Sequence, residues 1–459
     1  MTSSTTGFDP DLIRRYDISG PRYTSYPTAN LFRDDFPAGE YAGALQRLPD
    51  DARLSLYLHV PFCATVCYYC ACNKIITNNR RHAVEYLERL HREMALARAL
   101  IPAGHSVEQL HFGGGTPTYL TDPQFTALFA SLREHFNLLD TPQRDFSIEI
   151  DPRTVDPQRI RFLTGLGINR VSLGIQDFDP DVQAAVNRIQ SVADTRAIID
   201  AARRSGVESV SVDLIYGLPL QSTASFARTL ASVIDLAPDR ISLYSYAHLP
   251  QRFKTQRQIN VLDLPRAEIK LQLLQLAIDT LGGAGYEYIG MDHFARKDDS
   301  LVAAAQRGEL QRNFQGYTTH RHCDLVALGV SAISDVGGVY AQNGKDLKRY
   351  YELVDAGLLP IERGLVSSSE DALRREVIGE LMCHFHVDTA AVSARHGIDF
   401  HEHFADAMAE LERLERDGLV EVTEAAIRVT ARGRFLIRNV CMPFDAYLAP
   451  VSDSFSKAI

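Results

Sequence analysis

The chain has no tryptophan, no long apolar run and no excess of basic residues. No stretch approaches the ~18 consecutive apolar residues of a membrane span, and the opening stretch 1–17 lacks the apolar segment of a secretory signal. We therefore expect a cytoplasmic protein with no membrane span. The 48 Lys and Arg against 58 Asp and Glu give a net charge of −10. Because binding to nucleic acid requires a basic surface that neutralises phosphates, we also expect no nucleic-acid partner.

Length and composition indicate a large folded protein: 459 residues, 45% of them hydrophobic and 23% charged. At ~150 residues per domain the length suggests about three domains, although a single α/β barrel can use ~200–250 residues. Seven cysteines are too few and too unevenly spaced for a disulfide scaffold. Four of them lie within ten residues, and they are Cys63, Cys67, Cys70 and Cys72.

Short apolar runs alternate with helical patterns after the first fifty residues, which are rich in Pro, Gly and Tyr and read as an extended arm. The runs are 55–60, 107–112, 146–150, 170–175, 209–214 and 240–246. The helical patterns between them are 83–100, 122–136, 156–166, 179–188, 192–205 and 222–236. This alternation is typical of βαβ units around a parallel sheet. Six strands, where a complete barrel has eight, favour a partial, open (β/α)6 barrel.

Four regions follow from this pattern: an N-terminal arm (1–50), the barrel core (51–250), an extension that covers its open side (251–365) and a C-terminal domain (366–459). The last domain has helices, two short strands (419–423 and 426–429) and a final helix (431–439), which is a winged-helix-like order. Its helices are acidic, so we expect it to have a packing or lid role and not to bind DNA.

The cysteine cluster has three residues between Cys63 and Cys67 and two between Cys67 and Cys70. Three thiolates on one loop can hold three irons of a 4Fe-4S cluster and leave the fourth iron open, as a catalytic metal site requires. A structural zinc site using all four cysteines is the alternative, but zinc pairs are normally separated by a long loop. Because the cluster follows the first strand, it lies at the carboxyl ends of the strands, where the chemistry of such folds is found.

The cysteine spacing and the glycine run Gly113-Gly-Gly-Thr-Pro117 after the second strand resemble the radical S-adenosylmethionine (SAM) superfamily. In that superfamily the open iron binds SAM. Glycines allow close approach of the backbone and offer N–H groups, which suits the methionine end of SAM. Without a ligand, the same run would be an ordinary glycine-rich turn.

A narrower resemblance extends from about residue 12 to the segment 441–447. The motifs at 22–28, 63–74, 111–118, 149–153, 174–178, 213–219, 246–250, 290–295 and 313–319 are all similar to the family of oxygen-independent coproporphyrinogen III oxidases. That family converts two propionates of coproporphyrinogen III to vinyl groups without oxygen, giving protoporphyrinogen IX. The resemblance implies that a reduced cluster cleaves SAM to a 5′-deoxyadenosyl radical, which takes a hydrogen from the propionate before CO2 is lost.

The resemblance also implies site residues, by position. Cys63, Cys67 and Cys70 would ligate the cluster. A first SAM would lie against Tyr57, Tyr69, Gly114, Glu149 and Ile333. A second SAM would map onto Gly115, Thr116, Gln176, Arg188, Asp213 and Ala247. Taken singly, each has an ordinary structural role as its alternative, such as an ion pair for Glu149 or a solvated position for Arg188.

His59 and Glu149 are the catalytic candidates. A histidine between apolar strand residues is often a buried structural group, but the place of His59 before Cys63 suggests that it faces the cofactors and tunes the cluster. The four substrate propionates need cations, for which Arg22 and Lys74 are our candidates. No role is assigned to Cys72, Cys323, Cys383 or Cys441.

Two other interpretations stay open. A haem chaperone would share the cluster motif and barrel, but such relatives resemble a pattern with an aromatic two residues after the third cysteine, where this chain has Cys72. A winged-helix regulator with a redox-sensing cluster would need a basic recognition helix. For an oxidase, the resemblance implies coproporphyrinogen III as substrate, a reducing electron donor such as flavodoxin, and a monomer.

Overall fold

The computed structural model describes residues 8–18 and 20–448, which form two compact units. The sheet unit comprises Phe32–Pro265 and His322–Val366. The helical unit comprises the described residues up to Leu31, Arg266–Arg321 and those from Ser367 onward. Residues 251–365 are therefore divided between the two units. Among the described residues, no helix is both long and apolar enough to cross a membrane.

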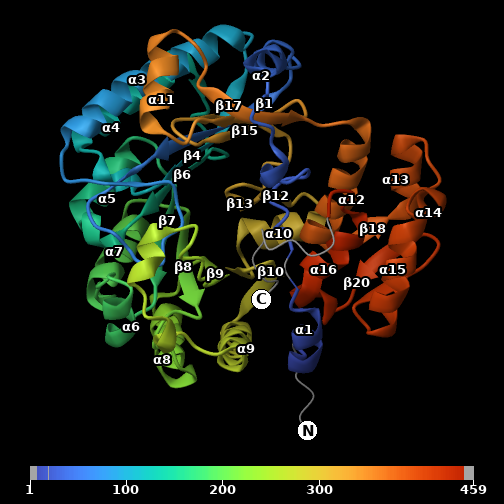
Figure 1. Ribbon diagram of the computed structural model, residues 1–459. Coiled ribbons are helices and arrows are strands. Elements are labelled where there is room, and N and C mark those ends of the chain that lie inside the picture. Colours follow the sequence, from blue (N-terminus) through green and yellow to red (C-terminus); the bar gives the residue numbers. More distant parts are fainter. Residues whose placement is uncertain (1–7, 19, 449–459) are drawn as a thin grey trace. The chain divides into compact units, whose positions relative to one another are not determined.

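Six parallel strands form the centre of the sheet unit, as the sequence predicts (Figure 1). In space they follow chain order: β1 (Arg53–Val60), β4 (Ser106–Gly114), β6 (Asp145–Ile150), β7 (Arg170–Gln176), β8 (Ser209–Tyr216) and β9 (Arg240–Ser245). Successive βα units wound in one direction place all six carboxyl ends at one edge. This confirms the predicted fold class.

The connecting helices lie along the outer side of the strands in Figure 1. They are α3 (Arg81–Leu100), α4 (Asp122–His135), α5 (Pro157–Gly165), α6 (Pro180–Ala185), α7 (Val192–Arg204) and α8 (Thr223–Leu236). Side-chain caps start most of them; the Thr121 hydroxyl accepts the Gln124 N–H in a capping box at α4. The prediction for α6 was too long, because the chain leaves the helix at Ala185 and turns at Asn187 with φ +54°.

The strands have two different faces, because successive side chains point to opposite sides. In β7 and β8 buried and half-buried positions alternate. The buried face is apolar and includes Val171, Leu173, Ile175, Val212 and Leu214. The half-buried face is polar and includes Ser147, Glu149, Ser172, Gln176, Ser211 and Asp213. The polar face is therefore the one available to ligands.

Four further strands extend the sheet beyond β1, where the sequence analysis expected an irregular cover for the barrel. β14 (Cys323–Leu328) pairs in parallel with β1, and β15 (Ile333–Val336), β16 (Val339–Asn343) and β17 (Ile361–Val366) follow antiparallel. α11 (Leu347–Asp355) connects the last two strands. Shorter elements of this unit are β2 (Phe62–Cys63), β3 (Ile75–Ile76), η2 (Pro117–Tyr119), β5 (Asn137–Leu138), η3 (Pro152–Thr154), η4 (Lys254–Gln258) and η5 (Val261–Asp263).

The N-terminal arm contains helices, so the prediction of an extended arm was wrong for its described part. α1 (Pro10–Tyr16) begins at the cap Asp9, with proline at its first position, where the missing N–H costs nothing. η1 (Ala29–Leu31) and α2 (Ala38–Gln46) follow. α1 and η1 belong to the helical unit, and α2 belongs to the sheet unit.

The helical unit combines two short hairpins with a mostly helical C-terminal region. The first part contains α9 (Ala267–Gly283), β10 (Tyr286–Gly290), β11 (His293–Arg296), α10 (Ser300–Arg307), β12 (Gln311–Asn313) and β13 (Gly316–Thr318). The second contains α12 (Ser369–His384), β18 (His386–Asp388), α13 (Thr389–His396), α14 (Phe400–His403), α15 (Ala405–Arg416), β19 (Val420–Val422), β20 (Ala426–Val429), η6 (Gly433–Leu436), α16 (Ile437–Cys441) and η7 (Met442–Phe444).

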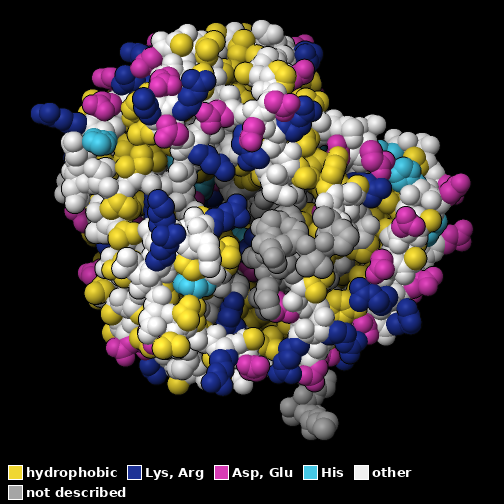
Figure 2. All heavy atoms as spheres, viewed as in Figure 1, with side chains coloured by type: hydrophobic (Ala, Val, Ile, Leu, Met, Phe, Trp, Pro, Cys, Tyr) yellow, Lys and Arg dark blue, Asp and Glu magenta, His cyan; other side chains and the backbone are white. Residues whose placement is uncertain are grey.

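The strands β18, β20 and β19 form one small sheet, in agreement with the winged-helix-like order. The predicted final helix, 431–439, is instead a 3-10 turn followed by the short α16. On the face seen in Figure 2, acidic side chains are spread over the region of α13 to α15.

Candidate active site

The cysteine loop starts directly after β1 and is closed at its base. β2 pairs with β3, so that Phe62 and Cys63 lie beside Ile75 and Ile76. Within the loop, the Cys70 N–H donates to the Cys67 carbonyl (3.2 Å). The structure therefore holds Cys63, Cys67 and Cys70 on one short loop at the carboxyl end of the first strand.

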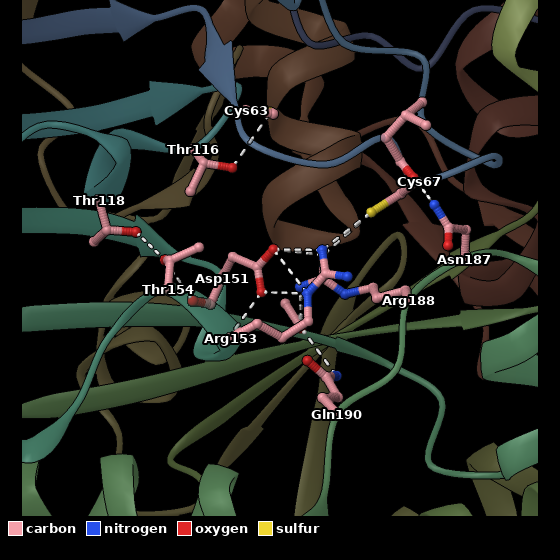
Figure 3. Close-up of polar contacts among 12 residues, drawn as sticks. Cys63, Cys67, Thr116, Thr118, Asp151, Arg153, Thr154, Asn187, Arg188 and Gln190 are labelled. Carbon is pink, nitrogen blue, oxygen red and sulfur yellow. Dashed lines mark hydrogen bonds and ion pairs between the residues drawn. The ribbon is translucent and has the colours of Figure 1, made fainter. Parts of the chain in front are cut away.

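Hydrogen-bond donors surround the thiols of this loop (Figure 3). The Thr116 hydroxyl donates to Cys63 Sγ (3.3 Å), and two guanidinium groups donate to Cys67 Sγ: Arg153 Nη2 at 3.4 Å and Arg188 Nη1 at 3.5 Å. Donors and cations stabilise thiolates, which are the ligands of iron–sulfur clusters. The chemistry of this donor set therefore fits a cluster held by three cysteines.

The acidity of the loop thiols differs with their surroundings. Burial raises the pKa of Cys63 to about 11, although the Thr116 hydrogen bond opposes this shift. A hydrogen bond from Cys72 lowers the pKa of Cys70 to about 6, and Lys74 contributes in the same direction. Among the described residues no three His, Cys, Asp or Glu side chains gather as a single metal ion would require. A zinc ion binds all of its thiolates at one centre, whereas a 4Fe-4S cluster takes each thiolate at a different iron.

The glycine run serves close packing between β4 and β1. A Cβ on Gly115 would lie 2.7 Å from the Pro61 backbone, and Gly114 has φ +114° with the His59 ring against it. The N–H of Gly115 donates to the Val60 carbonyl (2.8 Å), and the N–H of Thr116 donates to the Phe62 carbonyl (2.9 Å). The N–H groups of residues 114–116 thus have partners within the chain, where the sequence analysis expected them to face a ligand.

Glu149 lies at the centre of the polar face. Its Oε2 accepts the N–H of Gly114 (3.2 Å), and its Oε1 lies 3.4 Å from His111 Nε2. The Tyr57 ring stacks on His111 with centroids 5.7 Å apart. The Glu149 side chain is 45% exposed, so its carboxylate oxygens can accept further hydrogen bonds from a ligand. The structure brings Tyr57, Gly114 and Glu149 together, as the sequence analysis expected.

His59 is buried, and both of its ring nitrogens have partners. Nδ1 lies 3.1 Å from the Tyr57 hydroxyl, and Nε2 lies 3.0 Å from the carbonyl of Asn73. Burial lowers the pKa of His59, which favours the neutral ring. A neutral histidine in this position accepts from Tyr57 and donates to Asn73, which ties β1 to the far end of the cysteine loop.

Asp213 is the second acidic side chain of the polar face. Burial raises the pKa of Asp213 to about 6, and the negative charge of Glu149 contributes to the shift. The Ser172 hydroxyl donates to its Oδ2 (3.4 Å). Gln176 ends the neighbouring strand with φ +67°. In the register between β7 and β8, Gln176 pairs with Leu214, the residue after Asp213. Gln176 and Asp213 therefore lie near each other, toward the carboxyl ends of these two strands.

Buried Gln256 holds two of the predicted residues, Tyr69 and Ala247. Its Nε2 donates to the Tyr69 carbonyl (3.0 Å) and to the Ala247 carbonyl (3.2 Å). The Tyr69 ring packs against an apolar cluster of Val182, Val186, Leu218, Tyr246 and Ile259. Ile333 lies on β15, two strands away from β1, where the register from Leu325–Asp335 sets it opposite Ala327, the neighbour of Tyr57.

Arg188 has a more constrained place than the sequence suggested. It is not a solvated helical residue, because it follows the end of α6 and is only 6% exposed. Nη1 contacts Asp151 (3.2 Å) and Nη2 donates to the Gly174 carbonyl (2.5 Å), while Nε is buried without a partner among the described residues.

Sequence reasoning missed Asp151 and Arg153, although both lie in a motif that it noted. Arg153 Nη2 donates to Asp151 Oδ2 (2.7 Å), and Asp151 also contacts Arg188. Burial alone would raise the pKa of Asp151, but hydrogen bonds from Arg153 and the charges of both arginines lower it. The signal available was the Asp-Pro-Arg sequence directly after a strand that ends beside the cysteine loop.

The two cations proposed for the substrate already have partners. The Arg22 guanidinium donates a hydrogen bond to the Asp292 carboxylate within the helical unit. Lys74 Nζ donates to the Cys70 carbonyl (2.8 Å) within the sheet unit. Lys74 therefore acts on the cysteine loop.

Comparisons with known proteins show the family of this chain. Residues 57–233 match the radical SAM superfamily, and residues 367–436 match the HemN C-terminal domain. The oxygen-independent coproporphyrinogen III oxidase of Pseudomonas aeruginosa is 51% identical and that of Escherichia coli 47% identical; the alignments cover 99% and 100% of this chain and the same shares of those proteins. A solved structure described as coproporphyrinogen III oxidase (HemN) from Escherichia coli, a radical SAM enzyme, superposes with a TM-score of 0.92 at 46% identity, covering 96% of this chain and 99% of that one. With its three-cysteine loop and glycine run at the carboxyl ends of a parallel sheet, this chain belongs to the family of oxygen-independent coproporphyrinogen III oxidases in the radical SAM superfamily.

Proposed function

We propose that this chain oxidatively decarboxylates two propionates of coproporphyrinogen III to vinyl groups, giving protoporphyrinogen IX without oxygen in haem biosynthesis. The observation that carries this proposal is the loop of Cys63, Cys67 and Cys70 at the end of β1, in a chain similar over its whole length to proteins of that name.

Family membership implies a 4Fe-4S cluster and SAM. When bound, the two would supply the radical chemistry that removes a hydrogen from the propionate. The chain's own part is to hold the cluster on three thiolates and to keep the polar face dry enough that the radical meets only the substrate. The donors at Cys63 and Cys67 support this assignment of ligands.

For the first SAM we propose Tyr57, Tyr69, Gly114, Glu149 and Ile333. The half-exposed Glu149 carboxylate is the strongest of these candidates, since it can accept from an ammonium group or a ribose hydroxyl. His59 and Glu149 remain our candidates for catalytic roles. The contacts of His59 favour positioning of the cysteine loop, because both of its ring nitrogens are already used.

We further propose a second SAM at Gly115, Thr116, Gln176, Arg188, Asp213 and Ala247. The shared strand edge of Gln176 and Asp213 supports it. The contacts of Arg188 with Cys67, Asp151 and the Gly174 carbonyl use Nη1 and Nη2, and its buried Nε has no partner among the described residues, so this N–H is available to a SAM carboxylate.

The remaining proposals concern the setting of the reaction. We propose a cytoplasmic monomer that receives electrons from a donor such as flavodoxin and binds no nucleic acid. We also propose that the chain divides into an N-terminal arm (1–50), a catalytic core (51–250), its extension (251–365) and a C-terminal domain (366–459).

Anaerobic turnover tests the proposed function. The reconstituted, reduced protein is incubated with SAM and coproporphyrinogen III, and mass spectrometry follows loss of two CO2 per macrocycle together with 5′-deoxyadenosine. Protoporphyrinogen IX is the expected product. Haem binding with SAM cleavage but no macrocycle product, at full cluster content, would favour the haem-chaperone alternative.

A further inference from the structure

Two arginines from separate segments of the sheet unit converge on one of the three proposed cluster ligands (Figure 3). Arg153 lies in η3, directly after β6, and Arg188 lies in the segment after α6. Their guanidinium nitrogens are 3.4 Å and 3.5 Å from Cys67 Sγ. No arginine contact of this kind is recorded for the sulfur of Cys63 or Cys70 in the described structure, so the arrangement is specific to one ligand.

Asp151 holds both guanidinium groups in place. It accepts from Arg153 Nε (3.0 Å) and Nη2 (2.7 Å) in a two-pronged contact, and from Arg188 Nη1 (3.2 Å). The side chains of Asp151 and Arg188 are 10% and 7% exposed, and that of Arg153 is 20% exposed. Bidentate contacts with so little exposure fix the direction of the N–H groups as well as their charge.

The residues before and after Cys67 are also held in place. Asn187 Nδ2 donates to the carbonyl of Val66 (2.7 Å), and the N–H of Tyr68 donates to the carbonyl of Val186 (3.0 Å). These bonds flank Cys67 and join its loop to the segment that carries Arg188. The N–H to sulfur geometry is therefore built into the fold.

We propose that Arg153 and Arg188, oriented by Asp151, donate N–H···S hydrogen bonds to the Cys67 thiolate and place net positive charge beside the cluster, which raises its reduction potential. The inference rests on the proposed function, in which Cys67 ligates a 4Fe-4S cluster. Reduction adds one electron and so one negative charge to the cluster. Hydrogen bonds to ligand sulfurs and nearby positive charge stabilise the reduced state more than the oxidised state.

The charges beside Cys67 predict that removing an arginine and removing the aspartate shift the reduction potential of the cluster in opposite directions. Two guanidinium groups and one carboxylate sum to +1, so Arg153→Gln brings the sum to zero and Asp151→Asn brings it to +2. At a fixed solution potential, we expect the ratio of reduced to oxidised cluster to fall up to about tenfold in Arg153→Gln, which is ~59 mV for one electron. In Asp151→Asn the ratio is expected to rise. A purely structural role would not move the two variants in opposite directions.

The experiment is a redox titration of the reconstituted full chain without SAM, followed by the EPR signal of the reduced cluster. Iron and sulfide are counted first in every sample. Arg144→Gln is the matched control, because Arg144 is also part-buried but, among the described residues, donates only to the carbonyls of Gly167 and Thr141. Its potential should equal that of the unaltered chain.

The possible results distinguish failure of this inference from failure of the proposed function on which it rests. Absence of a cluster in the unaltered chain would overturn the proposed function and the inference with it. Full cluster content with an unchanged potential in Arg153→Gln would overturn the inference alone. If Arg153→Gln retains no cluster, Asp151→Asn decides: a raised potential supports the inference, and an unchanged or lowered one contradicts it.

Discussion

At the scale of single residues, Glu149 combines a fixed position with an open carboxylate. Replacing it by glutamine removes the charge and leaves the shape. Because hydrogen bonds to charged groups contribute ~1.5–3 kcal/mol, we expect Glu149→Gln to weaken SAM binding roughly 10- to 100-fold. Equilibrium binding of SAM to the cluster-loaded protein measures this. Glu208→Gln is the control, since Glu208 is similarly exposed (43%) but lies directly before β8, away from the carboxyl ends of the strands. Equal SAM affinity in Glu149→Gln and the control would contradict the assigned role.

Glu93 is a buried carboxyl that organises the strands next to the cysteine loop. It accepts from Asn343 Nδ2 (2.6 Å), from the Tyr350 hydroxyl (2.6 Å) and from the N–H of Gly329 (2.8 Å). Beside it, the Tyr86 hydroxyl donates to the carbonyl of His59 (2.6 Å). Burial raises the pKa of Glu93 to about 7, although its hydrogen bonds oppose the shift.

This raised pKa predicts a pH-dependent stability. Between the ordinary pKa of 4.5 and about 7, the folded state keeps a proton that the unfolded state has lost. The stabilisation from that proton is present at low pH and is lost as pH rises through 7, a change of about 3 kcal/mol. We therefore expect the free energy of unfolding, relative to Glu93→Gln, to fall between pH 5 and pH 8. Denaturant titrations across that range measure the difference, and a constant difference would contradict the prediction.

The predictable part of the site is the part that lies close together in sequence. Cys63, Cys67 and Cys70 could be predicted as ligands because their spacing alone places them on one loop. The contact of Arg153 and Arg188 with Cys67 could not be predicted, because it depends on three segments that are far apart in sequence and meet in space. A motif shows which residues matter, but side-chain direction at a strand end follows from packing.

At the scale of elements, the segments that leave β1 and β4 fit together because the residue directly after β4 is a glycine. A Cβ on Gly115 would meet the rigid Pro61 backbone at 2.7 Å. Since overpacking of this kind costs ~1–3 kcal/mol, we expect Gly115→Ala to lower the free energy of unfolding by about 2 kcal/mol and to reduce iron content after reconstitution. Gly165→Ala is the control, because nothing lies within 4 Å of a Cβ there. Retention of full stability and iron by Gly115→Ala would show that the strand ends can move apart.

Strong local patterns made most elements predictable. The six parallel strands and the helices α3, α4, α5, α7 and α8 lie where apolar periodicity placed them, within a few residues at each end. α1 was missed because a short helix in a proline- and glycine-rich stretch depends on its Asp9 cap more than on periodicity. β14 was missed because its apolar run gives no sign that it would pair with β1, a strand far away in sequence.

At the scale of the whole molecule, the proposed monomer has a direct test. A single chain has a mass of 51.2 kDa. We expect light scattering after anaerobic size-exclusion chromatography to give a mass near that value for the cluster-loaded protein, at micromolar concentration and at tenfold dilution. A mass near twice that value, stable on dilution, would contradict a monomer and would require an interface that the described surface does not identify.

The central claim is that decarboxylation of the macrocycle requires the cluster held by the three-cysteine loop. The most direct measurement is the number of CO2 lost per coproporphyrinogen III in anaerobic turnover, compared between the unaltered chain, Cys67→Ala and Cys323→Ala. Cys323 lies at the start of β14, outside the loop, and serves as the matched cysteine. We predict two CO2 lost with the unaltered chain and with Cys323→Ala, and none with Cys67→Ala. Unimpaired loss of CO2 with Cys67→Ala, or none with the cluster-loaded unaltered chain, would contradict the account.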